Sequence, residues 1–235
     1  NTLISPFDDP AYRPETYYYT DAISDHAVRF IREHTEAQSG SPFLMYVAYT
    51  APHWPLHAKP ADIAKYDGMY DQGYDPIRKA RFEKAVKAGV IAPGQTMAPT
   101  TGRWDDVEDK AWESAGMEVF AAMVDSMDQG IGRIVEELKK HGQFENTLIL
   151  SMHDNGGCHE TNGRAAKKGH PDGPRPAKPT FPPVSPQSVL ERTFFPLQTR
   201  DGFPMRMGPH VMPGPGDTFL AYGRNWANVS NTPFR

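Results

Sequence analysis

The sequence has little cysteine and no long apolar run, and each absence excludes a class of protein. Cys158 is the single cysteine in 235 residues, which excludes an internal disulfide framework and a cysteine-rich zinc site. No stretch approaches the roughly 18 to 20 consecutive apolar residues of a membrane helix. We therefore expect no membrane span, and the mean hydropathy of −0.61 fits a protein with much surface and loop.

Long basic runs are absent too. The formal net charge is −4, and acidic and basic residues are interspersed along the chain. Proteins that bind nucleic acids usually present a basic face, whereas here Lys167-Lys168 is only a pair in a polar segment. We expect no nucleic-acid partner.

Apolar spacing predicts several helices. One begins at Thr20 or Asp21, either of which could cap it, and ends before Gly40 and Pro42. A short turn is expected over 61–67, and a charged helix over 75–89. The strongest pattern covers 107–141, where an apolar stripe rich in methionine faces a core.

Two nearly continuous apolar runs predict strands that are buried on both faces, as in a parallel sheet. They are Pro42 to Tyr49 and Asn146 to Met152. Because strands alternate with helices, we predict an α/β fold.

Polar residues follow both predicted strands, at the edge of the sheet where open α/β folds bind ligands. His53 lies in a proline-rich loop and could transfer a proton near neutral pH, although a plain surface histidine or the nearby His57 are alternatives. Asp154 and Asn155 supply a carboxylate and an amide oxygen, which suit Ca²⁺ or Mg²⁺. The alternative is an ordinary Asp-Asn-Gly turn. Gly156 and Gly157 indicate a backbone that bends or approaches something closely.

The segment at about 161–217 is dense in proline, glycine and basic residues. A loop of this length inside a compact domain is either a functional excursion near a site or partly disordered. Cys158 has no basic motif around it, so we do not expect it to be a nucleophile.

In their order, these motifs resemble the type I sulfatase family, in particular its bacterial arylsulfatase-like branch. The resemblance covers nearly the whole chain. It rests on Ala51-Pro52-His53-Trp54-Pro55-Leu56, on Ala121 to Asp128, on Thr147 to Met152 running into Asp154-Asn155-Gly156-Gly157, and on Tyr222 to Arg235.

The resemblance implies an alkaline-phosphatase-like α/β sandwich with a mixed, mostly parallel sheet. It implies a hydrolase that cleaves the sulfate ester of a small molecule or carbohydrate, using one Ca²⁺ ion and a formylglycine made from a Cys-x-Pro-x-Arg cysteine. Asp154 and Asn155 match the later metal-binding pair, and His53 matches the histidine that contacts the sulfate and assists the leaving group. A periplasmic or secreted location follows from the resemblance alone.

The sequence departs from the family pattern at several points. Cys-x-Pro-x-Arg is absent, and neither Asp8-Asp9 nor Asp105-Asp106 follows a hydrophobic strand, so we assign neither pair to the metal. We expect residues 1–235 to be a central part of the N-terminal catalytic domain, with an incomplete sheet, and to be inactive alone. The formylglycine and the remaining metal ligands would lie outside this chain.

Two other functions stay open at this point. One is a phosphodiesterase or phosphonate monoester hydrolase of the same superfold. The other is a degenerate, non-catalytic member that binds anions.

Overall fold

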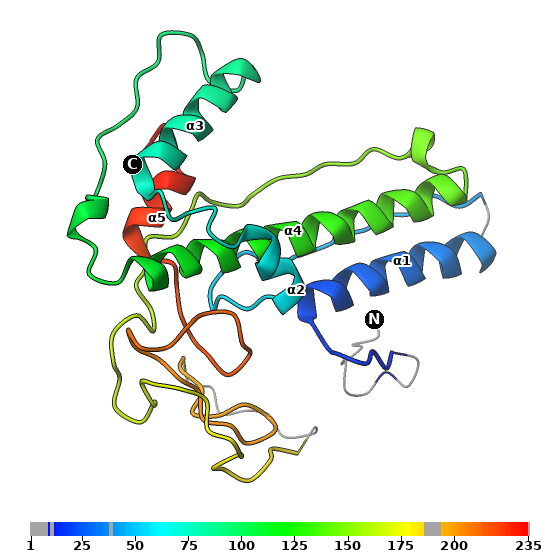
Figure 1. Ribbon diagram of the computed structural model, residues 1–235. Coiled ribbons are helices and arrows are strands. Elements are labelled where there is room, and N and C mark those ends of the chain that lie inside the picture. The colour runs from blue at the N-terminus through cyan, green and yellow to red at the C-terminus, as the bar shows by residue number, and fades with distance from the viewer. Residues whose placement is uncertain (1–8, 10–11, 38–39, 186–193, 235) are drawn as a thin grey trace. The chain divides into compact units, whose positions relative to one another are not determined.

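The computed structural model describes residues 9, 12–37, 40–185 and 194–234. The chain divides into two compact units, one formed by residues 1–51 and 123–152 and the other by 52–122 and 153–235. Figure 1 shows the helices, whose bounds are Tyr19–Ala37 (α1), Pro60–Ile63 (α2), Ala64–Tyr66 (η1), Tyr74–Lys87 (α3), Trp104–Asp106 (η2), Lys110–Lys140 (α4), Phe144–Asn146 (η3) and Gly223–Ser230 (α5).

The predicted helices are confirmed, with shifts at their ends. α1 begins at Tyr19, so Thr20 and Asp21 lie inside the helix and the predicted cap is wrong. α4 begins at Lys110 rather than at Val107. Its apolar stripe is buried as expected, since Val119, Met123 and Leu138 are among the core residues.

In the first unit, α1 and the C-terminal half of α4 run side by side (Figure 1). Arg32 Nε donates to Glu137 Oε1 at 2.9 Å, and Arg133 lies 3.2 Å from Asp25. The helices touch at Gly130, where an added Cβ would lie 2.0 Å from the Ser24 hydroxyl. A glycine that weakens α4 as an isolated helix therefore permits this close contact.

The segment at 42–49 is not a strand, which contradicts the prediction. One of its sides contacts the unit, since the Tyr49 hydroxyl lies 2.8 Å from Ser24 Oγ. The other side is open, with Leu44 99% exposed and Tyr46 91% exposed. The alternation of side chains is that of an extended strand, but among the described residues no other segment pairs with its backbone.

The segment at 146–152, the second predicted strand, is also unpaired within the described residues and open to solvent. It forms no strand, and Leu148, Leu150 and Met152 are exposed. Within the described residues, β-pairing is limited to three isolated bridges, His57–Gly214, Gln198–Pro204 and Arg206–Thr218. The predicted burial on both faces is therefore wrong for this structure, and it shows no mostly parallel sheet. A strand needs partners that an apolar pattern cannot supply by itself.

In the second unit, α5 packs against α3 through an aromatic core that the helix predictions missed. Trp226 meets the rings of Tyr70, Tyr74 and Trp104 edge-on. Its indole Nε1 donates to the backbone carbonyl of Glu113 at 2.8 Å. The Glu113 side chain is itself buried, so α5 is anchored to the start of α4 within this unit.

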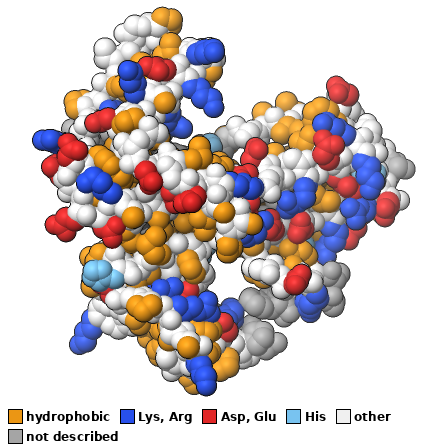
Figure 2. Space-filling model, viewed as in Figure 1, with side chains coloured by type: hydrophobic (Ala, Val, Ile, Leu, Met, Phe, Trp, Pro, Cys, Tyr) orange, Lys and Arg blue, Asp and Glu red, His pale blue; other side chains and the backbone are white. Residues whose placement is uncertain are grey.

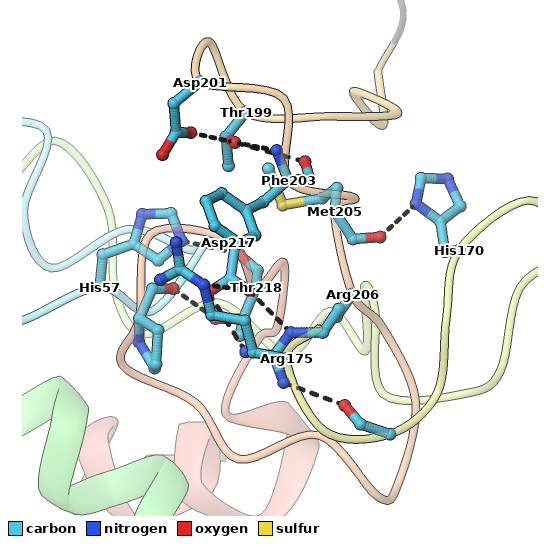
Figure 3. Close-up of polar contacts among 12 residues, drawn as sticks. His57, His170, Arg175, Thr199, Asp201, Phe203, Met205, Arg206, Asp217 and Thr218 are labelled. Atoms are coloured by element: carbon cyan, nitrogen blue, oxygen red, sulfur yellow. Dashed lines mark hydrogen bonds and ion pairs between the residues drawn. The ribbon is translucent and has the colours of Figure 1, made fainter. Parts of the chain in front are cut away.

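The described parts of the excursion at 161–217 are held by a buried ion pair. Arg206 contacts both carboxylate oxygens of Asp217, at 2.8 and 3.2 Å, and also donates to the Gly173 carbonyl at 3.0 Å (Figure 3). Arg175 lies over the Phe203 ring, 3.8 Å from its centroid. These contacts fold the excursion into defined loops; residues 186–193 lie outside the described part of the chain.

Among the residues that the structure describes, no helix is both long enough and apolar enough to cross a membrane. Figure 2 shows acidic and basic side chains mixed along the face in view.

Candidate active site

The candidate histidine, His53, lies on an exposed loop of the second unit. Its Nδ1 is 2.7 Å from the backbone carbonyl oxygen of Trp54. Because a carbonyl oxygen only accepts hydrogen bonds, Nδ1 must carry a proton, and Nε2 is left to exchange a proton with a ligand. Its ring also lies 4.5 Å from that of Trp54. The backbone and ring of Trp54 therefore orient the imidazole.

Trp54 is in turn fixed by the excursion. Its ring centroid lies 5.5 Å from that of Phe194 and 5.6 Å from that of Phe219. Phe219 belongs to a buried cluster with Met205 and Met207, against which Trp54 packs. The excursion thus supports the residue that orients His53, a role that sequence patterns did not indicate.

His57 lies in a different environment. Its Nε2 is 2.6 Å from the Thr218 carbonyl oxygen (Figure 3). Burial lowers the pKa of His57 below its usual value, the Thr218 hydrogen bond and Asp217 opposing the shift. A neutral imidazole committed to a backbone carbonyl is suited to holding a loop, so we retain His53 as the candidate.

This environment predicts that His57 makes stability depend on pH. Because the folded pKa is below the unfolded value, the unfolded state binds more protons once the pH falls below about 6.5. Stability is then greatest above that pH and decreases on acidification toward the folded pKa. Denaturant unfolding of His57→Gln across this range should show a shallower decrease than the wild type; equal slopes would contradict the assignment.

Asp154 and Asn155 lie together in an exposed, irregular segment. Asn155 Nδ2 donates to the Gly156 carbonyl at 2.9 Å, and among the described residues no hydrogen bond to Oδ1 is formed. In the described part of the chain, the Asp154 carboxylate has no hydrogen bond or ion pair. The loop therefore offers a carboxylate and an amide oxygen that protein groups do not occupy.

These donors fit a hard cation in kind but not in number. Ca²⁺ takes about six to eight oxygen ligands, and the pair supplies only part of such a set. No group of three or more His, Cys, Asp or Glu side chains that could hold a metal occurs among the described residues. A complete site would need further ligands.

No hydrogen bond or ion pair among the described residues joins His53 to Asp154 or Asn155. The expectation that they share one edge of a sheet stays a prediction, as do their roles. Two other acidic residues considered in the sequence have partners: Asp9 forms an ion pair with Arg29 at 2.7 Å, and Asp105 lies 3.5 Å from Arg103. Asp8 lies outside the described residues, and Cys158 is a half-buried free thiol.

Sequence reasoning missed Asn231, which binds the backbone next to the Asp154-Asn155 pair. Its side chain forms two hydrogen bonds with Gly157, at 2.7 and 2.9 Å. The predicted close approach at Gly156 and Gly157 is confirmed, since an added Cβ at either position would collide with side chains. The glycine pair was the available signal, although it did not identify the partner.

Comparison with known proteins gives consistent relatives. The family model described as Sulfatase matches residues 1–180. An uncharacterised sulfatase of Schizosaccharomyces pombe is 34% identical over 148 residues, which are 60% of this chain and 26% of that protein. An arylsulfatase of Klebsiella aerogenes is 27% identical over 225 residues, 94% of this chain and 41% of that protein.

A similar solved structure is that of Ps i-CgsB in complex with k-i-k-neocarrahexaose. It is 28% identical, covers 59% of this chain and 21% of that chain, and has a TM-score of 0.35. The chain spans less than half the length of the two curated relatives. The family model covers both candidate groups, His53 and Asp154-Asn155, and places the chain in the alkaline-phosphatase-like α/β class. The chain belongs to the sulfatase family.

Proposed function

We propose that this chain is part of an arylsulfatase-like hydrolase that cleaves a sulfate ester to an alcohol and sulfate. The observation that carries the proposal is the pair of exposed oxygens at Asp154 and Asn155, which no described protein group occupies. Their residue types match the metal-binding pair of the sulfatase family, whose model covers them.

In the proposed site, Asp154 and Asn155 contribute two oxygen ligands to a Ca²⁺ ion. When bound, such an ion supplies positive charge beside the sulfate oxygens, which lowers the cost of negative charge in the transition state. The Asp154 carboxylate carries one negative charge and the Asn155 amide carries none. The pair therefore attracts a divalent cation but leaves it with a net positive charge.

His53 would act as the proton donor to the leaving alcohol. Its Nδ1–H is held by the Trp54 carbonyl, so the proton that is transferred lies on Nε2 of the charged ring. An exposed imidazole can exchange this proton with water between turnovers.

The nucleophile is the part that this chain does not supply. The sequence contains no Cys-x-Pro-x-Arg motif from which formylglycine could form. We therefore propose that residues 1–235 belong to an N-terminal catalytic domain and do not hydrolyse esters alone. A periplasmic or secreted location belongs to the same proposal.

The substrate class follows from the family, and the excursion lies where it could shape the pocket. Because Phe194 and the buried Met205 and Met207 of the excursion pack on the side of Trp54, loops of the excursion lie beside the histidine loop. Loops next to a site commonly set its specificity. We propose a sulfated small molecule or carbohydrate as the substrate, with the excursion shaping the part of the pocket that receives the alcohol.

The test compares sulfate and phosphate esters. The protein that carries this chain, prepared at the length of its arylsulfatase relatives, should hydrolyse para-nitrophenyl sulfate much faster than bis(para-nitrophenyl) phosphate. The 235-residue chain alone should hydrolyse neither. Preference for the phosphodiester would favour the phosphodiesterase alternative, and inactivity of the longer protein toward both esters would favour a non-catalytic member.

A further inference from the structure

The Asp154-Asn155 pair lies in a segment without regular structure, so something else must hold it in place. Residues 153–160 form neither a helix nor a strand, and the pair itself is exposed. Within the described residues, the side chain of Asn155 forms a hydrogen bond only with its own neighbour, Gly156. A metal ligand on an unsupported loop would lose conformational freedom on binding, which would weaken affinity.

Support comes from Asn231, which follows directly after α5. The Gly157 N–H donates to Asn231 Oδ1 at 2.7 Å, and Asn231 Nδ2 donates to the Gly157 carbonyl at 2.9 Å. One amide thus satisfies both backbone groups of Gly157, as a neighbouring strand would. The paired bonds fix the orientation of the backbone two residues after Asn155.

Asn231 is itself held firmly. Its backbone N–H donates to the Ala227 carbonyl at 2.9 Å, and its carbonyl accepts from the Phe234 N–H at 2.8 Å. α5 is in turn anchored by Trp226, which is fully buried. The contact therefore connects the exposed metal-ligand loop to a rigid part of the same unit.

The glycine pair makes this approach possible. An added Cβ at Gly156 would lie 2.4 Å from Asn231 Oδ1, and one at Gly157 would lie 2.6 Å from the Tyr222 hydroxyl and 3.0 Å from Ser230 Cβ. Neither glycine has a positive φ angle. The requirement at both positions is consequently one of space for α5 and Asn231, rather than of turn geometry.

We infer that Asn231 is a positioning residue for the metal pair, and that it sets Ca²⁺ affinity by holding the backbone that presents Asp154 and Asn155. The inference rests on the proposed function, because it takes these two residues as ligands. Asn231 does not touch the ion; it acts through Gly157. Partners of this indirect kind typically change metal affinity by about 10- to 100-fold.

The test is a calcium titration, by calorimetry, of the longer protein that carries this chain, prepared at the length of its arylsulfatase relatives. Asn231→Ala should raise the Kd for Ca²⁺ by about tenfold or more, and Asn231→Asp, which keeps an acceptor for Gly157 N–H, should lie between it and the wild type. The matched control is Asn225→Ala on α5, whose amide contacts Thr101 and Tyr74 instead. It removes a comparable pair of bonds and should leave the Kd unchanged.

Hydrogen exchange provides a second measurement that does not depend on the ion. The Gly157 amide should exchange faster in Asn231→Ala than in the wild type. In Asn225→Ala its exchange should be as slow as in the wild type. If Asn231→Ala does not fold, Asn231→Asp carries the test alone.

The outcomes separate the two proposals. If Asp154→Ala removes calcium binding but both Asn231 variants retain the wild-type Kd, the positioning role is wrong and the metal pair stands. If the longer wild-type protein binds no Ca²⁺ at millimolar concentration, or if its Asp154→Ala variant binds as well as the wild type, the metal pair fails and the positioning role fails with it.

Discussion

Replacing Asp154 by Ala should remove calcium binding from the longer protein that carries this chain. The Asp154 carboxylate is the only charged donor of the proposed pair, it is exposed, and no described protein group competes for it. Its removal leaves only the neutral Asn155 oxygen. Residues that support metal ligands without touching the ion change affinity by about 10- to 100-fold, and the loss here should be larger. Calorimetric titration of the longer protein and its Asp154→Ala variant with Ca²⁺ measures this directly.

Asp105→Ala is the matched control for this substitution. Asp105 is also an exposed carboxylate in an Asp-containing pair of the same unit, but it lies beside Arg103 and follows no predicted strand. The Asp105→Ala variant should bind Ca²⁺ with the same Kd as the wild type. Equal losses in both variants would show that the chain attracts the ion through general charge rather than through a site.

Replacing His53 by Ala should slow sulfate-ester hydrolysis by the longer protein by about 100-fold or more. The effect should depend on the leaving group. A para-nitrophenolate leaves readily without a proton, so its ester should lose less rate than the ester of an alkyl alcohol. Measured kcat values for the two esters in the wild type and the variant check the proposed role of Nε2.

His210→Ala is a suitable control, because His210 is another exposed histidine of the second unit. It should keep both rates. A loss in His53→Ala that is the same for both esters would contradict proton donation and would assign His53 to binding of the sulfate instead.

The helices could be predicted because their signal is local. In α4, the burial of Val119, Met123 and Leu138 follows from the helical period of the sequence itself. α5 was missed because it has only eight residues and begins at a glycine. Its stability comes from burying Trp226 among residues distant in sequence, which no short window records.

The two predicted strands could not be predicted in this way, because their signal is not local. The apolar run at 42–49 predicted an extended segment, and the alternating exposure of Leu44 and Tyr46 agrees with one. Pairing is a property of the partner as well as of the segment, and within the described residues no partner is present. Burial on both faces therefore could not be concluded from the run alone.

For the candidate site, the sequence predicted which residues to consider but not what surrounds them. His53 and Asp154-Asn155 were identified by type, position after an apolar run and family resemblance. The contacts that orient them join residues far apart in the chain, such as Trp54 with Phe219 and Gly157 with Asn231. Among these contacts, the sequence indicated only the one at Gly156 and Gly157, because close packing leaves no room for a side chain there.

A structure of the protein determined with bound Ca²⁺ tests the central claim most directly. The account predicts one ion within about 2.3 to 2.6 Å of both an Asp154 carboxylate oxygen and Asn155 Oδ1, with the Asn231 hydrogen bonds to Gly157 retained. An ion bound elsewhere, with Asp154 and Asn155 free of it, would contradict the assignment of this pair as metal ligands.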